Sequence, residues 1–396
     1  EYLLLLDSRK EHVKFWRPQM LLLVRNPRSS CPLIHFVNDL KKGGLYVMGH
    51  IKVGQLSDME VDPMLDEYGH WLTLVDALKV KAFVELTVAN SVREGMQQMI
   101  RMSGLGAMKP NTIMLGYYDE EVPHDFFNEN GSLQSLDALR GASTSDGRSV
   151  FSLRTSTSEK VLDSREYVGM IADVLRMRKN ICLCRHFHNL DKRLISKSSC
   201  FKYIDVWPVN FFQPGDEDPF DTTSLFMLQL ACIINMVPGW KNLHLRVFLC
   251  EKYRQQQENG NTDSELPART SVHRLRQQLQ MLRIAASIHQ VPGWSQQVTA
   301  LRDGSVMEQM SPRVRRSRTN SFGGAPLDNA VRVYLLSVNQ LLRQHSEQTA
   351  ASFLYLPKPP QGENEATYLQ LLTEMTADLP PTVLVHGIHA VTSTTL

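Results

Sequence analysis

Continuous apolar runs alternate with amphipathic segments along this chain, and that alternation constrains the fold more than any other feature. Residues 19–25 contain an apolar run bounded by prolines, which is typical of a strand buried on both faces. A helix is expected over residues 29–42, because a serine N-cap precedes its apolar face and Gly43-Gly44 follow it. This order indicates the opening of an α/β unit.

The same order of strand and helix continues to residue 118. Further strands are expected over residues 45–53, 80–88 and 112–118, and further helices over 71–78 and 91–102. Short connections between alternating strands and helices predict a parallel sheet with right-handed crossovers.

The composition changes between residues 119 and 164, where Ser, Thr, Gly and Asn dominate. A structureless stretch of this length is uncommon inside a compact domain, so we expect a mobile linker there. A chain of 396 residues is long enough for two cores. The sequence therefore predicts a first α/β lobe over residues 1–118, a linker over 119–164 and a second α/β lobe over 165–396.

The second lobe repeats the alternating pattern. Its expected strands cover residues 181–185, 203–207, 243–250, 351–356 and 380–386, and its expected helices cover 165–178, 221–236, 273–289, 331–344 and 368–377. The helix over 221–236 is apolar on nearly all sides, which places it in a core or in an interface. Both lobes are expected to be Rossmann-like, each with a mainly parallel sheet flanked by helices.

The net charge argues against a nucleic-acid-binding protein, and the placement of the cysteines indicates the redox compartment. Lys and Arg number 43 against 41 Asp and Glu, so the net charge of +2 lacks the basic excess of a nucleic-acid-binding protein. The six cysteines lie mostly in apolar runs, which favours free thiols in a reducing compartment. No apolar run reaches the ~18–20 residues that span a bilayer. The first residue is Glu1 rather than Met, so the sequence is expected to be a piece of a longer protein.

Residues 103–116 carry a glycine-containing motif, Ser-Gly-Leu-Gly-Ala-Met-Lys-Pro-Asn-Thr, followed by an apolar strand. A glycine-rich loop that binds phosphate follows a strand and opens a helix. Here the glycines end a helix and lead into a strand. Gly104 and Gly106 therefore predict a tight connection in an α/β layer rather than a nucleotide site.

Cys182, Cys184, His186 and His188 alternate along one expected strand. Side chains two residues apart on a strand lie ~6.5–7 Å from each other, whereas tetrahedral zinc needs ligands under ~4 Å apart. A buried strand with packed thiols is therefore favoured over a zinc site, and no metal is expected. The motifs of serine hydrolases, P-loop proteins and zinc proteases are also absent from the sequence, so no enzyme activity is expected.

A basic loop is expected over residues 303–327, and the arginines between residues 309 and 327 have no acidic neighbour there. Arg316 and Arg318 precede Ser321, a spacing that suits a kinase with a preference for basic substrates. A phosphate on Ser321 would pair with neighbouring guanidinium groups, so Ser321 is the candidate phosphorylation site.

Several segments resemble the cytosolic C-terminal domain of the cation-chloride cotransporters. The resemblance spans almost the whole chain and is strongest in the motif whose positions are Gly104, Gly106, Lys109, Pro110, Asn111, Thr112 and Gly116. It extends to the segments that begin the first strand and form later strands, residues 17–23, 203–207, 245–248 and 380–385.

The resemblance implies two α/β lobes, similar to universal stress proteins, on the cytoplasmic face of a membrane below a twelve-helix transporter. It implies a homodimer that passes regulatory signals to its own membrane domain, where chloride-coupled ion symport takes place. It leaves open whether that membrane is the plasma membrane or an endolysosomal one. No cofactor is expected, although some relatives bind ATP in this domain.

Two alternatives remain open at this point. One is a free-standing α/β protein that binds an adenine nucleotide, which requires a strand-to-helix glycine loop. The other is a scaffold that modulates other cation-chloride cotransporters. For a pairing surface, the helix over residues 221–236 and its neighbours in the second lobe are the candidate.

Overall fold

The computed structural model describes most of the chain. The described residues are 17–106, 108–129, 150–155, 162–196, 200–213, 221–250, 266–292, 294, 329–360 and 364–388. They divide into two compact units, residues 1–192 and residues 193–396.

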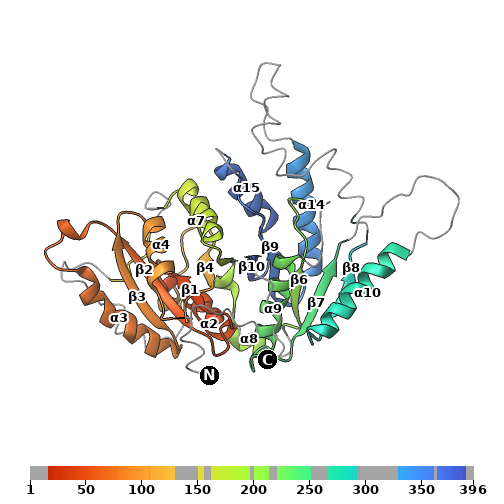
Figure 1. Cartoon of the computed structure of the whole chain (residues 1–396), viewed down its shortest axis with the longest axis horizontal. Helices are drawn as coiled ribbons and strands as arrows, with labels where there is room; N and C mark the ends of the chain where they lie inside the picture. Colours follow the sequence, from red (N-terminus) through yellow and green to blue (C-terminus); the bar gives the residue numbers. More distant parts are fainter. Residues whose placement is uncertain are drawn as a thin grey trace, which may run out of the picture. The chain divides into compact units, whose positions relative to one another are not determined.

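Unit 1 contains five parallel strands in the order β3-β2-β1-β4-β5. The strands are β1 Met20–Leu23, β2 Tyr46–Val53, β3 Phe83–Ala89, β4 Thr112–Gly116 and β5 Asn180–Arg185. The helices between them are α2 Pro27–Leu40, α3 Pro63–Leu78, α4 Val92–Met102, the short α5 Phe126–Glu129 and α7 Ser164–Arg176. In Figure 1, α4 and α7 lie on one side of these strands and α2 and α3 on the other. This is a doubly wound α/β arrangement.

Helix caps explain where several of these helices begin. Asn26, Asp62, Ser91 and Asp163 each have an extended backbone, and each side chain accepts a hydrogen bond from a backbone N–H in the first turn of α2, α3, α4 and α7 in turn. Capping side chains of this kind satisfy N–H groups that have no partner within the helix. The helix starts are therefore encoded locally.

Unit 2 has the same topology as unit 1. Its strands are β6 Tyr203–Trp207, β7 His244–Leu249, β8 Ser287–Gln290, β9 Thr349–Tyr355 and β10 Thr382–His386, and its main helices are α9 Thr222–Asn235, α10 Leu266–Met281, α14 Asn329–His345 and α15 Glu365–Met375. The parallel strands follow the order β8-β7-β6-β9-β10. In each unit the first strand in the sequence is thus the central one, and the third and fifth strands are the outermost two of the five.

The predicted fold class, with mainly parallel sheets flanked by helices, is confirmed. Helices α2 and α3 begin earlier than expected, at Pro27 and Pro63, because Asn26 and Asp62 cap them. Three further details differ from the expectation. The helix expected over residues 273–289 is α10, ending at Met281, followed by β8, because the alternating Ser287–Gln290 segment pairs with β7. Helix α7 and strand β5, expected in the second lobe, belong to unit 1, since β5 pairs with β4.

The third difference concerns α9. Ten of its fourteen residues are buried, and it packs on strands of its own unit. Its apolar surface therefore forms the core of unit 2, and the alternative of an interface for this helix is wrong. Among the described residues, no helix combines the length and hydropathy needed to cross a membrane.

Candidate functional site

The glycine motif lies at the amino edge of the unit 1 sheet, in the connection from α4 to β4. Gly104 and Gly106 have φ values of +81° and +60°. A Cβ on Gly104 would lie 2.0 Å from the carbonyl oxygen of Met108. The backbone N–H groups of Leu105 and Met108 each donate to the carbonyl oxygen of the other, at 3.1 and 2.9 Å. The motif is thus a tight turn whose backbone requires glycine at Gly104.

Asn111 connects the starts of three neighbouring strands. Its Oδ1 accepts from the backbone N–H of Gln19 at 3.0 Å, and its Nδ2 donates to the carbonyl oxygen of Arg17 at 2.9 Å. Its own carbonyl oxygen accepts from the N–H of Asn180. One side chain and its backbone therefore hold β1, β4 and β5 together at the amino edge.

The other motif residues lie beside this junction. Pro110 and Thr112 are buried, and the Thr112 hydroxyl donates to Asn111 Oδ1 at 2.9 Å. Lys109 is exposed. Gly116 ends β4, and its carbonyl oxygen accepts from the Tyr167 hydroxyl of α7 at 2.9 Å.

Ligands of doubly wound folds bind at the opposite, carboxyl edge, where the strand order reverses. In unit 1 this position lies between β1 and β4, beside the start of α2. The Asn26 side chain already accepts from the N–H of Arg28 and donates to the carbonyl oxygen of Ser152 at 2.8 Å. The guanidinium of Arg28 pairs with the carboxylate of Asp125. The polar groups that would receive a phosphate therefore have partners from the same chain.

Aromatic side chains fill the space next to these polar groups. Phe127 and Phe151 are 0% and 2% exposed, and their rings meet edge-on at 6.4 Å. Phe151 also meets the ring of Trp71 from α3 at 5.4 Å. Residues 119–129 and 150–155 come from the stretch expected to be a linker, so the described parts of that stretch cover the carboxyl edge of unit 1.

A buried carboxylate lies near the end of β2. Glu67 is 5% exposed, its Oε1 accepts from Lys52 Nζ at 2.8 Å, and its Oε2 lies 4.0 Å from His50 Nε2. Burial lowers the pKa of His50, although a hydrogen bond to the carbonyl oxygen of Val24 and the charge of Glu67 oppose that effect. The ammonium group of Lys52 thus offsets the charge of the buried Glu67 carboxylate, and we interpret this ion pair as structural.

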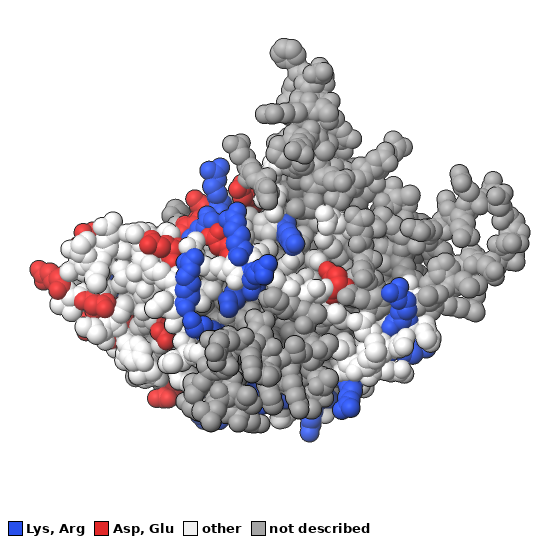
Figure 2. Space-filling view, viewed as in Figure 1, with Lys and Arg blue, Asp and Glu red and all other residues white. Residues whose placement is uncertain are grey.

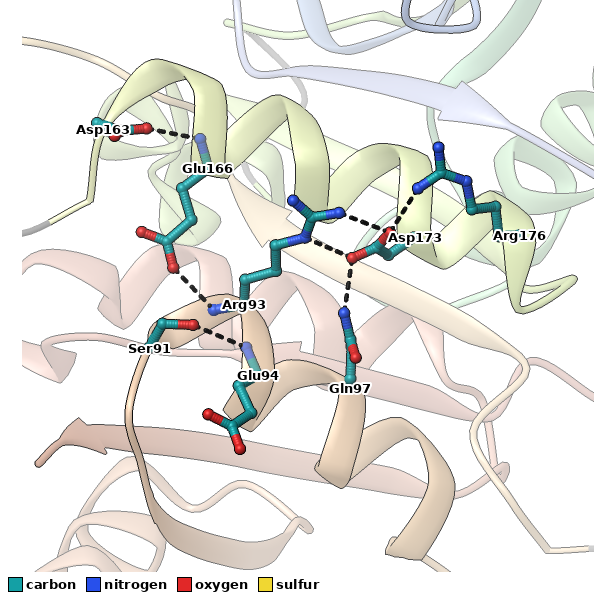
Figure 3. A network of polar contacts seen from close by, with 8 residues as sticks. All are labelled: Ser91, Arg93, Glu94, Gln97, Asp163, Glu166, Asp173 and Arg176. Carbon is teal, nitrogen blue, oxygen red and sulfur yellow. Dashed lines mark hydrogen bonds and ion pairs between the residues drawn. The ribbon is translucent and has the colours of Figure 1, made fainter. Parts of the chain in front are cut away.

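Helices α4 and α7 are joined by a network of charged groups (Figure 3). The guanidinium of Arg93 donates to both carboxylate oxygens of Asp173 at 2.5 and 2.8 Å. Gln97 and Arg176 donate to the same carboxylate at 2.7 and 3.0 Å. The Glu166 carboxylate accepts from the backbone N–H of Arg93 at 3.1 Å, so a side chain of α7 also satisfies the start of α4.

The electrostatics of this network centre on Asp173. Burial alone raises the pKa of the Asp173 carboxyl, but hydrogen bonds from Arg93 and Gln97 and the positive charge of Arg93 outweigh burial and hold the pKa below its usual value. The carboxylate is therefore ionised in the folded protein near neutral pH.

The cysteine and histidine run divides between β5 and the turn that follows it. Cys182 and Cys184 are buried in β5, and burial raises the pKa of both thiols. His186 takes a left-handed backbone conformation after the strand, and His188 is exposed. Within the described part of the chain, no three His, Cys, Asp or Glu side chains are placed to hold a metal ion.

The candidate phosphorylation site, Ser321 with Arg316 and Arg318, falls outside the described residues, as does the rest of the basic loop. The partners of Asn111, Asp173 and Arg28 are further features that sequence reasoning missed. The partners that join separate elements lie far away in the sequence, so no local pattern identifies them: Gln19 and Arg17 for Asn111, Arg93 and Gln97 for Asp173, and Asp125 for Arg28.

Comparison with known proteins relates the chain to one family. A sequence profile described as "Solute carrier family 12" matches residues 30–122. "Solute carrier family 12 member 9" of Danio rerio is 42% identical over 411 residues, which cover 100% of this chain and 42% of that protein. Within the family the sequence resembles the divergent ninth member, the cotransporter-interacting protein, and this match confirms that resemblance.

Two further proteins are similar to the chain. "Vacuolar cation-chloride cotransporter 1" of Saccharomyces cerevisiae is 32% identical over 305 residues, covering 72% of this chain and 26% of that protein. The "crystal structure of the cytoplasmic domain of a prokaryotic cation chloride cotransporter" covers 95% of this chain and 99% of its own, with a TM-score of 0.48 and 11% identity. The chain spans less than half of the length of the two relatives.

Proposed function

Because the chain belongs to solute carrier family 12, we propose that it is the cytosolic regulatory and dimerisation domain of a cation-chloride cotransporter. The observation that carries this proposal is the similarity to "Solute carrier family 12 member 9" over 100% of the chain. The matched region is only 42% of that protein. The remaining length of such a protein would hold the membrane domain. In this proposal the chain lies on the cytoplasmic face of the membrane and has no catalytic role.

Ion transport is assigned to the membrane domain. A longer protein that contains this chain is expected to carry out chloride-coupled symport in liposomes, and exchange of this domain for an unrelated one should change the rate of flux. Absence of chloride-dependent flux from a correctly folded, reconstituted protein would contradict the assignment to transport. It would favour the alternative of a scaffold, for which co-purification with another cotransporter is the test.

Nucleotide binding is the second candidate function. The position between β1 and β4 supports nucleotide binding only through the topology of the sheet, because Arg28 pairs with Asp125 and because Phe127 and Phe151 fill the adjacent space. We therefore expect calorimetry with ATP to show no heat of binding to this chain. Tight binding that Arg28→Ala abolishes would reverse that expectation.

For the pairing of two copies we propose the outer face of α3. Leu65, Tyr68 and Leu72 lie on one stripe of this helix and are 71%, 45% and 41% exposed. Strand β3, which contacts α3, pairs only with β2 among the described strands, so its other edge has no strand beside it there. Open edges and apolar stripes are surfaces that a second copy of a chain covers.

Regulation by phosphorylation stays a sequence-based proposal. A kinase that prefers basic substrates would modify Ser321, three residues after Arg318 and five after Arg316. The test is a phosphopeptide centred on Ser321 in protein isolated from native cells. Recovery of the peptide that contains Ser321 without phosphate, at good coverage, would contradict this proposal.

A further inference from the structure

The amino edge of the unit 1 sheet carries a row of cations. Each of the five strands is preceded by basic residues, and the connecting segments 17–19, 41–45, 79–82, 103–111 and 177–179 contain no Asp or Glu. In the spatial order β3-β2-β1-β4-β5, the cations are Lys79 and Lys81, Lys41 and Lys42, Arg17, Lys109, and Arg178 and Lys179. With strands ~4.8 Å apart, the row extends over about 19 Å.

Five of these cations have no carboxylate partner within the described part of the chain. Among the described residues, no Asp or Glu forms an ion pair with Arg17, Lys41, Lys79, Lys81 or Lys109. Lys41 Nζ instead donates to the carbonyl oxygen of Lys81. Burial and the positive charge of Lys81 both lower the pKa of Lys41. The fold thus holds like charges side by side at this edge.

Stabilisation of helix ends does not account for the row. Cations near a helix C-terminus interact favourably with the helix dipole, and the same helix ends occur in unit 2 because its topology is the same. Yet the equivalent described connections of unit 2 carry three cations and two acids, namely Lys202, Lys241, Arg283, Glu347 and Asp378. The excess of positive charge is therefore a property of unit 1 alone.

Backbone conformation adds to this argument. Lys42, Lys79 and Arg178 occupy left-handed positions, with φ of 35°, 54° and 54°. Glycine or asparagine adopts this conformation at the end of a helix with less strain than a long side chain does. Arg283, Gln348 and Asp378 in unit 2 have the same conformation, so strain alone does not mark function. At three of the five connections in unit 1, however, the left-handed position carries a positive charge, whereas among these three positions of unit 2 only Arg283 does.

Exposed apolar side chains lie at the same edge. Met102 and Leu105 are 80% and 78% exposed, the largest values among the described large hydrophobic residues. Leu105 belongs to the tight turn of the glycine motif, whose backbone is held by Gly104 and by two hydrogen bonds to Met108. Phe83, the first residue of β3, is 65% exposed beside Lys81.

Cations beside largely exposed apolar side chains are the combination that binds the surface of an anionic bilayer. The charges attract acidic headgroups, and the apolar side chains enter the boundary between headgroups and acyl chains. We propose that the amino edge of unit 1 docks on the anionic lipid surface of a membrane, with Leu105 as its apolar tip. This inference rests on the proposed function, which places the chain next to a membrane.

The test is flotation of the 396-residue chain with vesicles of phosphatidylcholine, with and without phosphatidylserine. The chain is expected to float only with the anionic vesicles and to be released by high salt, since screening weakens surface charges. Lys79→Gln, Lys81→Gln and Lys109→Gln together should lower partitioning on the order of 100-fold, at about fivefold per cation near an anionic surface.

The matched control removes three cations from the equivalent edge of unit 2, through Lys202→Gln, Lys241→Gln and Arg283→Gln. It should change partitioning less than about threefold, because it removes the same net charge from residues that do not belong to the row. Equal losses in the two triple variants, with unchanged thermal melting of both, would overturn the proposal.

The apolar contribution is tested by Leu105→Ser, with Met281→Ser as its control, since Met281 is 71% exposed in unit 2. Leu105→Ser should lower partitioning about fivefold and Met281→Ser should leave it unchanged. Binding of an acidic peptide in place of anionic vesicles would overturn the lipid assignment. The vesicle assay requires no transport, so its failure is separate from a failure of the flux experiment.

Discussion

At the scale of single residues, the turn between α4 and β4 depends on a backbone conformation that glycine adopts without strain. Gly104 has a positive φ, and a Cβ there would meet the Met108 carbonyl oxygen. A Cβ on Gly116, at the end of the same β4, would have no neighbour within 4 Å. The two glycines therefore differ in what an added methyl group would do.

We predict that Gly104→Ala lowers the free energy of unfolding by more than about 1 kcal/mol, because it strains the turn and forces Met108 to move. Gly116→Ala is the control and should change it by less than about 0.5 kcal/mol. Urea denaturation of the two variants checks this. Equal stability of Gly104→Ala and the unchanged chain would show that the turn relaxes freely.

Sequence reasoning at this scale identified the motif but not how it works. The order of helix, glycines and strand predicted a tight connection, since that order is local information, and a tight turn lies there. The junction made by Asn111 was not predictable, because Gln19 and Arg17 lie 92 and 94 positions away in the sequence. Only the pairing of β1 with β4 brings them together.

At the scale of elements, the joint between α4 and α7 is the feature with the clearest electrostatic consequence. The pKa of Asp173 is lowered in the folded state, so the ionised form stabilises the fold. That contribution is fully present above the pKa of the unfolded carboxyl, ~3.9. It is lost as the pH falls through the lower pKa of the folded state.

We predict that Asp173→Asn lowers stability at pH 7 on the order of 2 kcal/mol, because Arg93 and Gln97 lose a charged acceptor. The stability of the variant should also fall less steeply than that of the unchanged chain as the pH drops below ~4. Urea denaturation across this pH range measures both effects. Asp76→Asn, which alters an exposed carboxylate of α3, is the control; a pH dependence of Asp173→Asn equal to that of the unchanged chain would contradict the prediction.

At the scale of the whole molecule, the proposed surface for pairing two copies is the outer face of α3, because α9, the helix suggested by the sequence, is mostly buried in unit 2. Figure 2 shows acidic side chains scattered over the end of unit 1 that carries β3. Glu60 and Asp66, which are exposed, flank the apolar stripe of α3. Two copies that meet on this face would bring like charges together, so salt should strengthen the dimer by screening them.

We predict that Leu65→Glu with Leu72→Glu converts the dimer to a monomer, because it buries charge in the proposed interface. Light scattering measures the change. Leu336→Glu with Val333→Glu is the control, since these residues are 46% and 55% exposed on α14. A full-length protein that is monomeric before any substitution would contradict the pairing itself.

The sequence by itself determined the class of fold, the starts of α4, α7 and α9 and the tight connection at the glycine motif, because caps, apolar periodicity and the order of elements are local properties. The tertiary structure decided which segments form which unit, that α9 belongs to a core, and that residues 119–129 and 150–155 cover the carboxyl edge of unit 1. It also decided that cations from five separate connections form one row. Parallel pairing alone brings the starts of five strands to one edge, and no local pattern contains that information.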